Sequence, residues 1–181
     1  MTQRSIFLTL FIFILAAIGG AQTAPTKVGI INSEAFYDEK AGITKLVTGT
    51  KTVNDGFITV RTELDTMNTR LKTLAAEIEN MRKQPNPNAQ VMQAKADEAA
   101  QLQRNLGYKA EDAKTAYAKK ESQVLNPIRA AIGQSLQEFA KAKGYALIFD
   151  IAKDQTGLLV AVGDQSVDVT KDFITYYNAK P

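Results

Sequence analysis

The chain has 181 residues and a nearly balanced charge, with 22 lysines and arginines, 19 aspartates and glutamates, and a formal net charge of +3. It contains no cysteine and no histidine, which excludes disulfides, thiolate or imidazole catalysis, and metal sites built on those side chains. So small a net charge also gives little support for a nucleic-acid partner.

The N-terminus has the features of an export signal. Arg4 supplies a positive charge, residues 6–18 form an uncharged apolar run, and Gly19, Gly20 and Ala21 are small. This order is typical of a cleaved secretory signal, whereas an uncleaved anchor would need a longer run of about 20 apolar residues to span a membrane. We therefore expect residues 1–21 to be a signal peptide and the mature protein to be exported.

A small body is expected to begin after the signal, over residues 22–40. Residues 27–31 (KVGII) are short and β-branched, which predicts a strand. Asn32 or Ser33 can cap a short helix by accepting a hydrogen bond from a free backbone N–H. Phe36 on that helix is expected to be a core residue.

A heptad pattern predicts a long helix in the middle of the chain. The apolar positions from Val53 onward follow one another in alternating steps of three and four residues, without a break, which is the spacing of a coiled-coil seam. The positions after Val53 are Phe57, Val60, Leu64, Met67, Leu71, Leu74, Ile78 and Met81.

This helix is expected to turn back on itself at residues 84–88. Pro85 and Pro87 cannot both lie inside a helix, because each lacks an N–H and clashes with the preceding turn. A second run, rich in Ala, Gln and Lys, begins at Ala89. We therefore expect an antiparallel hairpin arm over residues 41–127, starting near Ala41.

Three glycines lie beside the seam near the base of the arm. Gly42, Gly49 and Gly56 are seven residues apart, and each costs about 1 kcal/mol relative to alanine in a helix. Close approach of a neighbouring helix and flexibility are both consistent with this spacing. If flexibility is the reason, the arm bends near Gly49 and Gly56.

The end of the returning helix can also be predicted. Pro127 lies where the arm should rejoin the body, which predicts a kink or a break there. Lys141 and Lys143 carry the positive charge that suits a helix C-terminus, and Gly144 is suited to cap it.

The remaining residues are expected to complete the body, over residues 128–181. The sequence predicts strands at residues 146–149 and 158–162 and a final amphipathic helix capped by Thr170. The N-terminal strand can form a sheet only with these strands, so the body encloses both ends of the arm. The predicted fold class is α+β. Because so small a body cannot supply a large core, we expect it to assemble into an oligomer.

No catalytic constellation is present in the sequence, and we expect no enzyme activity. No glycine-rich phosphate loop follows an expected strand. Adjacent carboxylates, such as Asp38 with Glu39 and Asp97 with Glu98, point about 100° apart on a helix and cannot face each other as an acid and base pair.

Several cations lie on the outer arm among acidic residues. A mixed charged face on a coiled coil is usually solvated surface, and the alternative is that some cations attract acidic clients or anionic lipid head groups. These cations are Arg61, Arg70, Lys72, Arg82 and Lys83, to which we add Met81 and Met92 as apolar candidates for client contact.

Three segments of the chain resemble the signatures of the Skp/OmpH family of periplasmic chaperones. They are residues 27–32 followed by Phe36, residues 143–150, and residues 167–170. The segments occur in the family's order, with the helical hairpin between them, so the resemblance covers the whole mature chain. Asn32 departs from the pattern, because the family usually has Asp there, and the arm is less densely charged than in many members.

The resemblance implies a periplasmic homotrimer in which a shared β-barrel body carries helical arms around a cavity. Unfolded outer-membrane β-barrel proteins would be held in that cavity without ATP, cofactor or nucleic acid. A structural or scaffolding coiled-coil protein of the envelope is the alternative. The residues expected in the core of the trimer body are Val28, Ile30, Phe36, Leu147, Phe149, Leu159, Val160 and Val162.

Overall fold

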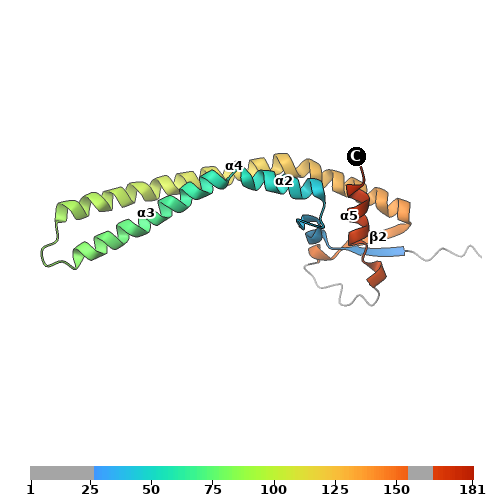
Figure 1. Ribbon diagram of the computed structural model, residues 1–181, viewed down its shortest axis with the longest axis horizontal. Helices are drawn as coiled ribbons and strands as arrows, with labels where there is room; N and C mark the ends of the chain where they lie inside the picture. The colour runs from blue at the N-terminus through green and yellow to red at the C-terminus, as the bar shows by residue number, and fades with distance from the viewer. Residues whose placement is uncertain (1–26, 155–164) are drawn as a thin grey trace, which may run out of the picture.

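The computed structural model of the protein describes residues 27–154 and 165–181. A long helical arm projects from a small body that contains the β-strands and the last helix (Figure 1). The expected signal peptide, the expected strand at 158–162 and the candidate core residues on that strand lie outside the described residues. Among the described residues, no helix combines the length and the hydropathy that crossing a bilayer requires.

The body contains a small parallel sheet. Strand β1 (Lys27–Ile31) pairs with β2 (Tyr145–Asp150), with Val28 opposite Leu147 and Ile30 opposite Phe149. The whole arm separates these two strands in the sequence, so the sheet joins the two ends of the arm. The prediction that the N-terminal strand pairs with a C-terminal strand is confirmed.

The arm consists of three helices. Helix α2 (Thr44–Asp55) and α3 (Ile58–Arg82) follow one another along α4 (Ala89–Lys143), which is 55 residues long and returns antiparallel to both (Figure 1). The expected seam positions on α3 are at least partly buried, and Leu74 is completely buried. At the tip, Asn88 caps α4 by accepting a hydrogen bond from the N–H of Val91 at 3.0 Å.

The first arm helix differs from its prediction at two places. It begins at Thr44 and not near Ala41, because the Asp38 carboxylate accepts hydrogen bonds from the N–H groups of Lys40 and Ala41 and holds residues 38–42 in a turn. It also breaks at residues 56–57, although the apolar pattern continues through them. Apolar spacing reports which side faces the partner and not whether the backbone hydrogen bonds are continuous.

The sequence predicted a kink or a break at Pro127, and the structure shows no break there. Helix α4 continues through Pro127 to Lys143. Pro127 and Gln123 are both exposed, so the carbonyl that loses its N–H partner lies on the solvent side, where water can hydrogen-bond to it.

The end of α4 matches its prediction. Gly144 has φ of 72°, in the left-handed region that glycine adopts without a steric penalty, and its N–H bonds the carbonyls of Ala140 and Lys141. Lys141 and Lys143 occupy the last turn, as expected.

The core of the body is built around aromatic side chains. Helix α5 (Thr170–Asn178) packs against α4, and the short 3₁₀ helix η2 (Ser33–Tyr37) packs against α5 and α2. The Phe173 ring lies 5.4 Å from that of Phe36 and 5.6 Å from that of Phe139. The remaining short 3₁₀ helices are η3 (Ile151–Lys153) and η4 (Gln165–Val167).

The caps of the body helices were partly predicted. Asn32 caps η2 through a hydrogen bond from the N–H of Glu34. Thr170, expected to cap α5, is its first residue, and the carboxylate of Asp168 accepts the Thr170 N–H instead. The Thr170 hydroxyl accepts the Asn32 N–H at 2.9 Å and so ties the start of α5 to the end of β1.

Candidate functional site

Ion pairs between α3 and α4 fix the register of the arm. Arg70 donates to the Glu98 carboxylate at 3.0 Å from Nε and 2.7 Å from one terminal nitrogen. Lys95 lies 2.6 Å from the carboxylate of Glu77. Lys109 pairs with Glu63 nearer the body. Spaced along the hairpin in this way, the pairs specify one alignment of the helices although each exposed pair contributes little alone.

Glu77 is electrostatically coupled to both helices. Its pKa is held below the ordinary value, mainly by the hydrogen bond from Lys95; desolvation opposes this, and the charges of Lys95 and Arg70 lower the pKa further. Glu77 is therefore stabilised in its ionised form by the folded hairpin.

The predicted client-binding cations fall into two groups. Arg70 pairs across the hairpin, whereas Arg82 and Lys83, at the end of α3, lie 4.0 and 3.6 Å from Glu79 on the same side of the hairpin. Arg61 and Lys72 are exposed and make no ion pair in the part of the chain that the structure describes. These last two cations have their full charge available to a partner.

The outer end of the seam is apolar and only partly covered. Met81 and Met92 are both partly buried there. Val91, which the sequence reasoning did not single out, is 40% exposed beside Met92. It could have been found as an apolar residue off the seam, in the first turn of the returning helix.

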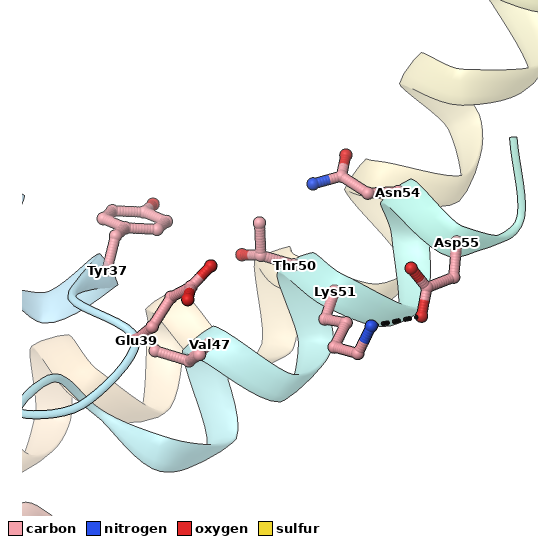
Figure 2. A pocket seen from close by; sticks show the side chains of 7 residues that line it. All are labelled: Tyr37, Glu39, Val47, Thr50, Lys51, Asn54 and Asp55. Atoms are coloured by element: carbon pink, nitrogen blue, oxygen red, sulfur yellow. Dashed lines mark ion pairs between the residues drawn. The ribbon is translucent and has the colours of Figure 1, made fainter. Parts of the chain in front are cut away.

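A shallow cavity of about 530 Å³ lies at the base of the arm (Figure 2). Lys51 and Asp55, one turn apart on α2, form an ion pair of 2.9 Å at its edge. Its lining residues are Tyr37, Glu39, Val47, Thr50, Lys51, Asn54 and Asp55. None of the residues predicted from the sequence lines this cavity. No periodic pattern points to it, because its walls come from η2, the following turn and α2.

One face of the β-sheet is apolar and uncovered. Val28, Leu147 and Phe149 are exposed by 38%, 54% and 46%. In the parallel register Val28 is opposite Leu147 and Ile30 is opposite Phe149, so all four lie on the same face. Ile30 is 7% exposed, and its backbone forms a β-bridge with Asp168. Of the other predicted body-core residues, Phe36 is buried in the core of the chain.

The described residues contain no group of His, Cys, Asp and Glu side chains that could hold a metal ion. Ile31 and Ile148 on the opposite face of the sheet pack into the core. The surfaces that could bind a partner are the charged hairpin and the uncovered face of the sheet.

The arm, in which α2 and α3 pack along α4, gives the protein a coiled-coil architecture on a small α+β body. The chain belongs to the OmpH-like family, because the family model described as outer membrane protein (OmpH-like) matches residues 27–177. A search of curated proteins finds no match. Membership supports a chaperone-type function that involves binding outer membrane proteins, in the periplasm or at the outer membrane.

Proposed function

We propose that the protein is an ATP-independent periplasmic holdase that keeps unfolded outer-membrane β-barrel proteins between its arms. In this proposal residues 1–21 direct export, residues 41–127 form the arm, and the flanking segments form the body. The activity is binding, without a catalytic step or a cofactor. The observation that carries the proposal is a charged hairpin arm joined to a body with an uncovered apolar sheet face.

The uncovered sheet face supports assembly into a homotrimer. Burying a large apolar side chain contributes about 1.5–3 kcal/mol, and Val28, Leu147 and Phe149 together offer several such side chains. A sheet this small is marginal by itself. Strands completed across protomers would bury the face, remove the edges and place several arms around a common cavity.

The chemistry of the arms suits a weak and reversible grip on clients. Unfolded β-barrel chains expose strand edges that pair and aggregate, and a cage keeps those edges apart. Arg61 and Lys72, which are exposed and make no ion pair among the described residues, are available to attract acidic segments of a client, or anionic lipid head groups. Distributed contacts of this kind hold the client without fixing one conformation.

The alternative is a structural coiled-coil protein of the envelope. Such a spacer would need the arm but not an apolar face that assembles the body. The test is the aggregation of a denatured outer-membrane β-barrel, followed by light scattering, with the mature protein near stoichiometric ratio and no nucleotide. A holdase suppresses aggregation, whereas a spacer leaves it unchanged.

A further inference from the structure

The arm has a single discontinuity, and it affects only one of the paired helices in the described chain. Helix α2 ends at Asp55 and α3 begins at Ile58, while α4 continues unbroken alongside. Figure 1 shows the hairpin changing direction where α2 meets α3. The Phe57 N–H bonds the Asn54 carbonyl at 3.0 Å, three residues back, and the regular spacing of four resumes with Arg61 and Phe57.

The spacing of the buried positions also changes near residues 56–57, on both sides of the helical hairpin. An added step of four residues in a heptad pattern locally unwinds a coiled coil. Buried or partly buried positions follow one another in two steps of four residues at Gly49, Val53 and Phe57 on the outgoing side. The same spacing occurs at Ala113, Tyr117 and Glu121 on α4. Successive steps of four recur on α4 at Val124, Ile128 and Ile132, so the change in spacing accompanies the break and does not locate it alone.

The segments on either side of the boundary at residues 56–57 are each joined by contacts between the paired helices. On the body side, a Cβ at Gly49 would lie 2.9 Å from Ile128, so α2 and α4 are in close contact. On the outer side, the ion pairs of Lys109 and Lys95 join α4 to α3. Bending is therefore expected at the boundary itself and not within either segment.

Three side chains bridge the boundary. Tyr117 on the continuous helix donates a hydrogen bond of 2.8 Å from its hydroxyl to Oδ1 of Asn54, in the last turn of α2. The ring of Tyr117 packs edge-on against that of Phe57, with centroids 5.2 Å apart. One side chain of α4 thus contacts both the end of α2 and the junction residue.

We propose that residues 56–57 are the pivot of the arm and that Tyr117, Asn54 and Phe57 form a latch that sets its angle. The aromatic contact keeps the helices together when the arm bends. The directional hydrogen bond to Asn54 selects one angle, because it can form only while α2 keeps its position relative to Tyr117. Breaking that bond releases the pivot without separating the helices.

The test is the distribution of distances between spin labels across the pivot. The chain has no cysteine, so Asn80→Cys on α3 and Lys171→Cys on α5 place labels only at these exposed positions. Dilution with unlabelled protein restricts the measured pairs to those within one chain, whatever the oligomeric state.

Tyr117→Phe keeps the ring and removes the latch hydroxyl. The population of distances outside the wild-type peak should rise about fivefold, which corresponds to the loss of about 1 kcal/mol for one hydrogen bond. Asn54→Ala should have the same effect from the other side. The double variant should be no broader than either single variant, because both changes break the same bond.

Tyr108→Phe is the matched control. Tyr108 lies on the same helix and is 72% exposed, so removing its hydroxyl should leave the distribution unchanged. Circular dichroism checks that every variant keeps its helix content. A Tyr117→Phe distribution equal to that of Tyr108→Phe, or additive broadening in the double variant, would overturn the latch.

Discussion

Gly49 of α2 lies directly against Ile128 of α4, so closely that a Cβ on Gly49 would approach Cδ1 of Ile128 to 2.9 Å and Cδ2 of Leu125 to 3.1 Å. Gly49 therefore lies where the two helices approach closely, which favours packing over flexibility as the reason for this glycine. Gly56 differs, because its added Cβ would meet only backbone oxygens of its own helix at 3.4 Å or more. It caps the end of α2 and lies at the break.

Gly49→Ala should destabilise the protein, although alanine favours a helix. Overpacking a filled interface costs about 1–3 kcal/mol, and a methyl group at Gly49 would have to displace the ends of the Ile128 side chain and of the buried Leu125 side chain. The free energy of unfolding in urea measures the effect. Gly133→Ala on α4 is the control: nothing lies within 4 Å of its added Cβ, so it should stabilise by about 0.5–1 kcal/mol. Equal effects of the two changes would contradict this account of Gly49.

Leu147→Asp should abolish assembly of the body. If the uncovered sheet face is buried between protomers, an unpaired carboxylate there costs several kcal/mol. Analytical ultracentrifugation of the mature protein gives the mass, and hence the oligomeric state, of the variant and of the wild type. Ile58→Asp is the control, because Ile58 on the arm is also 54% exposed, as Leu147 is, and its mass should match the wild type. A folded monomer in the wild-type protein at micromolar concentration would disprove the trimer.

Arg61→Gln with Lys72→Gln should weaken the binding of acidic clients and leave the unfolding temperature unchanged, because neither cation makes an ion pair among the described residues. Arg70→Gln should instead lower the stability of the arm, by about 0.2–1 kcal/mol for an exposed pair. Client affinity and thermal unfolding are measured for each variant. If Arg70→Gln lost client affinity and the double variant did not, Arg70 would be the client contact and Arg61 and Lys72 would not.

The hairpin should lose stability in acid through Glu77. The folded-state pKa of Glu77 lies below its ordinary value of 4.5, so the ionised form is favoured by folding. Its stabilisation is fully present above the unfolded-state pKa and disappears as the pH falls through the folded-state pKa. The difference in unfolding temperature between wild type and Glu77→Gln should therefore vanish at low pH.

Asp65→Asn is the control for this pH series, because Asp65 lies on the same helix and makes no ion pair within the described residues. Its difference from wild type should vary less with pH than that of Glu77→Gln. A Glu77→Gln difference that stays constant from neutral pH to acid would show that the ion pair with Lys95 does not stabilise the hairpin.

The elements with strong local patterns could be predicted from the sequence. The seam ending at Met81, the tip at residues 84–88 and the Gly144 cap each follow from periodicity or from one residue's backbone preference. Pairing of the first strand with a C-terminal strand also followed from the sequence, whereas its parallel direction and its register did not.

Features that depend on contacts between distant residues could not be predicted. The break at residues 56–57 lies inside an uninterrupted apolar pattern, and it becomes understandable only with Tyr117 packed beside it. Arg70 and Arg61 are both arginines on a charged face, and only the register of the hairpin shows that Glu98 pairs with Arg70. The basal cavity likewise combines residues from η2 and α2.

The most direct test of the central claim is to remove the outer arm and measure holdase activity. Replacing residues 60–110 with a short connector keeps Phe57, Tyr117 and the body. The shortened protein should therefore form the same oligomer as the wild type, with the mass reduced only by the deleted residues. The account predicts that this variant no longer suppresses aggregation of a denatured outer-membrane β-barrel, while the intact protein does so without nucleotide. Full suppression by the shortened protein, or a requirement for ATP in the intact one, would contradict it.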